Sequence, residues 1–180
     1  LSIRRQRQMC IRDREGRLYK GCLYAGLMVT EAGPRVVEFN ARFGDPETQV
    51  VLPLLESDLV DVMLACIDGK LAETEVKWSD GAAVCIVMAA GGYPKSYNKG
   101  DEIVGIGASE ADGCTVFHAG TSAKDGHIYT NGGRVLGVVA KADGIKEAVD
   151  KAYAGVDKIS FKDAHFRHDI AHWALERLNK

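Results

Sequence analysis

Length, composition and charge are those of an ordinary globular protein. The chain has 180 residues, of which 46% are hydrophobic and 27% charged, and its formal net charge is −2. This balance excludes a general polyanion-binding surface, so we expect no nucleic-acid partner. No apolar run reaches the roughly 18–20 residues of a membrane span, and the start has no secretory signal, so we expect no membrane partner. Five cysteines without CxxC spacing favour buried free thiols and a cytoplasmic location.

Residues 1–14 form an arginine-rich segment with five arginines and one aspartate. Such a segment is either a basic arm for nucleic acid or an unrelated or disordered leader, and it also resembles a translated sequencing adapter. Because no aromatic or glycine-rich groove residues accompany the charge, we favour the leader and leave the segment out of the fold prediction.

Two strands are predicted between residues 19 and 41. Segments 19–30 and 35–41 are rich in β-forming side chains, and the sequence EAGP at 31–34 is typical of a turn. We therefore expect an antiparallel hairpin whose second strand is buried. Gly26, inside the first strand, indicates either the close approach of a backbone or ligand, or simple packing.

The most informative stretch, VVEFNARFGDPE at 36–47, leads from that second strand into a polar loop. Glu38, Asn40 and Arg42 are two residues apart, and a strand places such positions on one face. Carboxylate and amide oxygens suit Mg²⁺, and a guanidinium suits phosphate. The spacing therefore predicts a metal–nucleotide site. The alternative is a solvated strand face with an incidental ion pair.

From Pro46 onward the hydrophobic period becomes helical. We expect a helix there, followed by a second helix over 58–68 that Ser57 caps and Gly69 ends. The GDPE turn at 44–47 then lies at a helix N-terminus, where free backbone N–H groups favour an anion. For the two acids of this turn, the alternative is the ordinary preference for acids in a first helical turn.

The second half of the chain follows a polar connector at 70–81. The apolar run AAVCIVMAA at 82–90 predicts a strand buried on both faces. Later apolar stretches with glycine-rich turns predict a small antiparallel sheet or flattened barrel. These stretches are 102–106, 114–119, 126–130 and 133–140. Helices are expected at 143–157 and 169–179.

Two polar clusters in this half have competing explanations. Gly132, Gly133 and Arg134 at a strand start suit a phosphate or carboxylate, or else form a tight turn with an exposed arginine. The spacing H-x2-H-x3-H at 165–172 mimics a zinc site. Aromatic and charged residues interrupt it, and Asp169 has the character of a helix N-cap, so we do not expect zinc.

The chain has no P-loop, Rossmann, GxSxG or HExxH motif. The segment EFNARFGDPETQ resembles the signature of the phosphoribosylamine–glycine ligases (glycinamide ribonucleotide synthetases), ATP-grasp enzymes of purine biosynthesis. The likeness covers about residues 15–180, through LYAGLMVT, GGYP, VFHAGT, TNGGRVLGVVA and FRHDIAHWAL. Two positions depart from it, because His168 and Ala171 stand where the family usually has lysine and glycine.

The resemblance implies an α+β fold that begins with the C-terminal piece of an ATP-grasp domain. This piece, a β-hairpin plus helices, is expected over 15–70. A connector at 71–81 follows, and then a small antiparallel β-sheet or barrel domain with two helices over 82–180.

The resemblance also implies an activity, the ATP-dependent ligation of glycine to 5-phosphoribosylamine through glycyl phosphate. Glu38 and Asn40 would bind Mg²⁺ or Mn²⁺, and Arg42 would stabilise the transferring phosphoryl group. The substrate-binding residues would be Gly44, Asp45, Pro46, Gly132, Gly133 and Arg134. The rest of the ATP-grasp domain is expected upstream of residue 15, so we expect this chain to be inactive alone.

Two other functions remain open: a non-catalytic β-rich binding module, and another ATP-grasp carboxylate–amine ligase. The oligomeric state, monomer or oligomer, also remains open.

Overall fold

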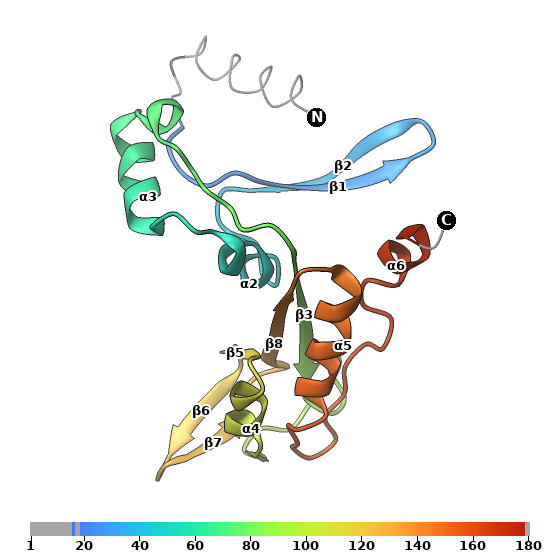
Figure 1. Ribbon diagram of the computed structural model, residues 1–180. Coiled ribbons are helices and arrows are strands. Elements are labelled where there is room, and N and C mark those ends of the chain that lie inside the picture. The colour runs from blue at the N-terminus through green and yellow to red at the C-terminus, as the bar shows by residue number, and fades with distance from the viewer. Residues whose placement is uncertain (1–15, 17–18, 179–180) are drawn as a thin grey trace. The chain divides into compact units, whose positions relative to one another are not determined.

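The computed structural model describes residues 16 and 19–178, which form two units (Figure 1). Unit 1 contains the described residues up to Asp45 together with Leu55–Lys77, and unit 2 contains Pro46–Leu54 and everything from Trp78 onward. Both units combine helices with antiparallel strands, which confirms the predicted α+β class. The leader expected at 1–14 lies outside the described residues.

Unit 1 begins with the predicted hairpin, β1 (Tyr24–Thr30) and β2 (Gly33–Asn40). Thr30 pairs with Gly33, whose φ of 94° lies in the left-handed region that glycine adopts readily. The expectation that β2 is buried was wrong, since Val37 is 67% exposed. The reason is that β2 pairs only with β1 in a two-stranded sheet, and no buried apolar side chain of the described chain lies in this unit.

The second helix of the prediction is α3 (Leu59–Asp68), also in unit 1. Its cap is Asp58 rather than Ser57: the Asp58 carboxylate accepts from the N–H groups of Val60 at 2.7 Å and Asp61 at 3.2 Å. The Ser57 hydroxyl instead accepts from the backbone N–H of Lys77. Gly69 ends α3 with φ 76°, as predicted. The 3₁₀ turn Leu71–Glu73 follows.

Unit 2 includes α2 (Thr48–Val51), a single helical turn that tightens into a 3₁₀ turn at Leu52–Leu54. The longer helix predicted from Pro46 was therefore wrong. Pro53 explains the change. Proline has no backbone N–H to donate to the carbonyl four residues earlier, and its ring crowds that carbonyl. A helix this short carries little dipole, which weakens the argument for an anion at its N-terminus.

The main sheet of unit 2 is antiparallel in the order β3-β8-β5. Its strands are β3 (Ala82–Ala89), β8 (Arg134–Ala142) and β5 (Thr115–His118). The sheet packs against α5 (Ile145–Val156), a helix confirmed close to its predicted bounds (Figure 1). The strand buried on both faces is β8 rather than β3. The latter lies at the sheet edge and leaves alternate side chains half-buried.

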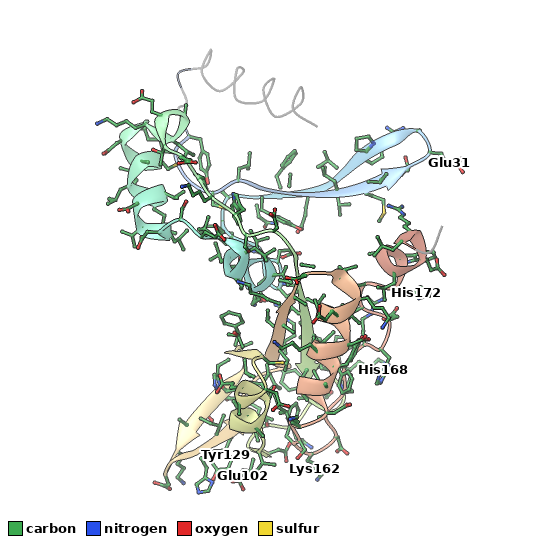
Figure 2. The ribbon with its side chains drawn as sticks, in the orientation of Figure 1. Glu31, Glu102, Tyr129, Lys162, His168 and His172 are labelled. Atoms are coloured by element: carbon green, nitrogen blue, oxygen red, sulfur yellow. The ribbon has the colours of Figure 1, made fainter. Side chains whose placement is uncertain are left out.

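A second three-stranded sheet has the order β4-β7-β6, so the strands make two small sheets rather than one flattened barrel. Its strands are β4 (Glu102–Ile103), β6 (Thr121–Lys124) and β7 (His127–Thr130). A tight turn with positive φ at Asp125 and Gly126 joins β6 to β7. Figure 2 shows Glu102 and Tyr129 near each other on this sheet, where they are direct partners. The sequence pattern missed β6 and α4 (Ile106–Ala111), both too short for a clear period.

The last helix, α6 (His172–Leu178), begins three residues later than predicted. Ala171 before it has φ 64°, which interrupts the helix, and the Asp169 carboxylate bonds to Arg167. Among the described cysteines, which are all free thiols, only Cys114 is buried; Cys22, Cys66 and Cys85 are half-buried. Within the described ranges, no helix has the length and apolar character to cross a membrane.

Candidate metal and phosphate site

The clearest polar pair of the predicted site is Glu38 with Asn40, at the end of β2. The Asn40 amide Nδ2 donates a hydrogen bond to Glu38 Oε1 at 2.9 Å. Glu38 is exposed and Asn40 is half-buried. The two-residue spacing thus brings a carboxylate and an amide together on one strand face, as the sequence predicts.

This pair has the donor set that a hard divalent cation prefers. With Nδ2 directed at Oε1, the Asn40 Oδ1 and the Glu38 Oε2 are the oxygens left for a ligand, and both suit Mg²⁺ or Mn²⁺. Two protein ligands fit a cation that keeps waters and phosphate oxygens in its remaining positions. Among the residues that the structure describes, no group of three or more His, Cys, Asp or Glu side chains is placed to hold a metal.

Arg42 lies just beyond this strand face. β2 ends at Asn40, and Arg42 falls in the bend that follows. Its Nη1 donates to the carbonyl oxygen of Phe43 at 2.8 Å. Arg42 is exposed, and since a guanidinium has five N–H donors, one backbone bond leaves most of its capacity for an anion.

The remaining predicted residues of the GDPE turn straddle the boundary between the units. Gly44 is buried and Asp45 exposed in unit 1, whereas Pro46 is half-buried in unit 2. Gly132, Gly133 and Arg134 also lie in unit 2. The predicted substrate-binding residues are therefore distributed over both units.

The glycines at 132 and 133 have a packing role inside unit 2. A Cβ at Gly133 would lie 2.2 Å from Cδ2 of Tyr93, and a Cβ at Gly132 would lie 2.9 Å from the Cα of Gly120. Gly133 also accepts a backbone hydrogen bond from Ala90 at 2.8 Å. Arg134, exposed, begins β8 opposite Ala89. The structure thus supplies a reason for these glycines that needs no ligand.

The histidines of the H-x2-H-x3-H spacing each have another neighbour. His165 pairs through its backbone with Ala89, and the His168 ring stacks on Tyr153 with 10° between the planes. His172 lies 3.1 Å from Glu176 within α6. His118, outside this group, is exposed, with Nδ1 3.0 Å from the Thr121 hydroxyl.

Two residues beside the Glu38–Asn40 pair were not predicted as part of the site. Tyr24 is the cross-strand partner of Asn40, and Gly26 is the partner of Glu38. Sequence period alone identifies which side chains share a face of one strand. It does not give the register between two strands, so these partners emerge only in the structure.

A solved biotin carboxylase domain shares the fold of the chain. That domain, from the Hydrogenobacter thermophilus 2-oxoglutarate carboxylase, matches 88% of the chain with a TM-score of 0.56, and the chain covers 36% of it. The sequence identity is 15%, so this likeness concerns the fold alone.

The sequence matches are more specific. The family description "Phosphoribosylglycinamide synthetase, C domain" matches residues 83–173, and "Phosphoribosylglycinamide synthetase, ATP-grasp (A) domain" matches residues 6–48. The chain therefore belongs to the phosphoribosylglycinamide synthetase family, which confirms the resemblance found in the sequence.

Two relatives illustrate the match. The phosphoribosylamine–glycine ligase of Caldanaerobacter subterraneus subsp. tengcongensis is 53% identical over 158 residues, which are 88% of this chain and 37% of the relative. The crystal structure of the Thermotoga maritima phosphoribosylamine–glycine ligase is 38% identical, with a TM-score of 0.75 over 87% of this chain and 38% of that one. The chain thus spans little more than a third of the relatives' length.

Proposed function

We propose that this chain is part of an ATP-dependent ligase that joins glycine to 5-phosphoribosylamine and releases ADP and phosphate. The Glu38–Asn40 pair carries the proposal, because it joins a carboxylate and an amide at 2.9 Å within the segment that resembles the family signature. Family membership and the names of the relatives support the choice of substrates. The resulting glycinamide ribonucleotide belongs to purine biosynthesis.

The reaction we propose has two steps. A carboxylate oxygen of glycine attacks the γ-phosphorus of ATP, so that glycyl phosphate forms and ADP leaves. The amine nitrogen of 5-phosphoribosylamine then attacks the acyl carbon and loses a proton, while inorganic phosphate leaves. The products are the amide, ADP, phosphate and the released proton, which balances the atoms of both steps.

In this proposal the chain's own residues bind charge. Glu38 and Asn40 hold Mg²⁺ or Mn²⁺, which when bound neutralises phosphate charge. Arg42 directs its remaining N–H groups at the transferring phosphoryl group. We also assign substrate binding to Gly44, Asp45 and Pro46, and to Gly132, Gly133 and Arg134 of unit 2.

A chimeric ligase tests this function. Residues 15–180 replace the matching segment of the Thermotoga maritima enzyme, and ADP release is measured with and without glycine and 5-phosphoribosylamine. We expect release that depends on both substrates, and a loss of about 10²-fold or more when Glu38→Gln or Arg42→Ala is introduced. The 180-residue chain by itself is expected to show no glycine-dependent ADP release.

The matched control is Glu31→Gln, the same chemical change at the tip of the hairpin, where Figure 2 shows Glu31. It should leave the rate within about twofold, because a change at a remote exposed position has little effect. A folded chimera whose rate is equally insensitive to Glu38→Gln would disprove the metal-ligand role. Equal turnover with another carboxylate in place of glycine would favour a different ATP-grasp ligase.

A further inference from the structure

Gly26 lies directly across the hairpin from Glu38. A Cβ at position 26 would lie 3.2 Å from Cγ of Glu38, and 3.8 Å from both the Glu38 backbone nitrogen and Cε1 of Tyr24. A side chain at position 26 would therefore press on the stem of the Glu38 side chain, which would have to shift by a few tenths of an ångström.

The backbone does not require glycine at this position. Gly26 is not among the glycines with positive φ, so an L residue can adopt its conformation without strain. Glycine inside a strand weakens the strand relative to alanine. Space for the Glu38 side chain is thus the structural reason for glycine here, which decides between the two explanations that the sequence leaves open.

The neighbouring register reinforces this arrangement. The regular pairing of Gly26 with Glu38 and of Tyr24 with Asn40 breaks immediately after Gly26, where Leu27 pairs with Val36. Val37 is thus the extra residue of a β-bulge, a feature that re-aims side chains at a strand end. Tyr24 and Gly26 therefore lie on the same face of the hairpin as the Glu38–Asn40 hydrogen bond.

We propose that Gly26 is a positioning residue of the metal site: its missing side chain lets the Glu38 stem lie flat against β1, which holds the carboxylate beside Asn40. Gly26 itself contacts neither metal nor substrate. This inference rests on the proposed function, because Glu38 and Asn40 are metal ligands only within it.

The first test uses NMR of the complete 180-residue chain, without metal, to measure the conformation of the Glu38 side chain. The unchanged chain should show a nuclear Overhauser effect between the Gly26 Hα and Glu38 Hγ protons and a single dominant Glu38 χ1 rotamer. Gly26→Ala should displace the Glu38 stem, which changes the populations of the Glu38 χ1 rotamers and shifts the Asn40 side-chain amide protons. Absence of the Overhauser effect in the unchanged chain overturns the proposal, even if Gly26→Ala does not fold.

The second test adds Mn²⁺ and follows paramagnetic broadening of the Asn40 side-chain amide. Gly26→Ala should raise at least tenfold the Mn²⁺ concentration that gives half of the maximal broadening. Glu38→Gln should abolish site-specific broadening. Gly107→Ala is the matched control, because a Cβ there would meet no atom within 4 Å. It should leave both the rotamer and the Mn²⁺ response unchanged.

The outcomes separate the two proposals. Broadening in the unchanged chain that persists at the same concentration in Gly26→Ala overturns the positioning role and leaves the proposed function standing. If the unchanged chain shows no broadening at Asn40, the metal assignment fails, and the positioning role fails with it. A rotamer change accompanied by weakened Mn²⁺ binding supports both.

Discussion

The two units differ in the burial of their apolar side chains. All buried apolar residues of the described chain lie in unit 2, where β3, β8, β5 and α5 enclose one continuous core. Unit 1 exposes its large apolar side chains on both strands of the hairpin and along α3. One unit is therefore stabilised by burial and the other by backbone hydrogen bonds and helix caps.

This difference bears on where the proposed chemistry lies. Glu38, Asn40 and Arg42 belong to the unit that lacks a core of its own, and an isolated two-stranded hairpin is marginally stable in water. Exposed apolar patches of this kind are typical of surfaces that bind a partner or a ligand. Unit 2 should therefore fold more stably than unit 1.

Leu136→Ala should produce the largest loss of stability. Leu136 is fully buried in β8, and removing its side chain leaves a cavity that costs about 2–5 kcal/mol. Leu64→Ala in α3 is the matched control; at 52% exposed, it should change the unfolding free energy by about 0.5 kcal/mol or less.

Urea unfolding followed by tryptophan fluorescence provides the measurement, because Trp78 and Trp173 both lie in unit 2. Amide hydrogen exchange reports α3 separately for the Leu64 variant. Equal losses from the two substitutions would contradict the contrast between the units.

Gly133→Ala should have the next largest effect. The added methyl would overlap the half-buried Tyr93 ring, whose neighbour Tyr97 is also within 3.0 Å of the new methyl, and such overpacking costs about 1–3 kcal/mol. Gly26→Ala in unit 1 meets the flexible stem of Glu38 and should change stability by less than about 1 kcal/mol. Thermal and urea unfolding of both variants test the order. The comparison is reversed if Gly26→Ala proves the more destabilising.

Asp58→Ala should destabilise α3 by about 1 kcal/mol, because two N–H groups lose their acceptor. Faster amide exchange across Leu59–Asp68 would report the loss. Ser57→Ala removes the acceptor of the Lys77 N–H and should leave exchange in α3 nearly unchanged. If Ser57→Ala opened α3 and Asp58→Ala did not, the cap assignment from the structure would be incorrect.

The successes and failures of the sequence predictions follow from the range of the interactions involved. The hairpin, α5 and the Glu38–Asn40 adjacency depend on local period and turn residues, so they were predictable. The cap of α3 was misassigned because Ser57 and Asp58 are adjacent and both are good caps. Burial of β2 was predicted from its apolar residues, but burial depends on neighbouring layers that a strand's own sequence does not describe.

The site shows the same division. Arg42 was expected on the strand face, yet β2 ends at Asn40, and no change of period marks that end. The role of Gly26 depends on a register set by the bulge at Val37. Pairing across strands is a long-range property, so a single sequence gives little information about it.

The smallest expected effect concerns an exposed ion pair in unit 2. Arg167 donates to Asp169 through Nε at 2.8 Å and Nη2 at 2.6 Å, and this side-chain hydrogen bonding holds the pKa of Asp169 below its ordinary value. For a carboxylate with a lowered pKa, the ionised form is favoured in the folded state. Its contribution is therefore present above the ordinary aspartate pKa of about 3.9 and is lost as the pH falls through the lowered value.

An NMR titration of the Asp169 carboxyl carbon should give a midpoint below that ordinary value. Arg167→Gln should raise the midpoint toward the ordinary value. The chemical shifts of the His168 ring, which stacks on Tyr153, give a second signal from the same turn. Lys146→Gln, which removes the exposed pair with Asp150 on α5, is the matched control and should leave the Asp169 titration in place. An Asp169 midpoint that is the same with and without Arg167 would show that the ion pair does not persist in solution.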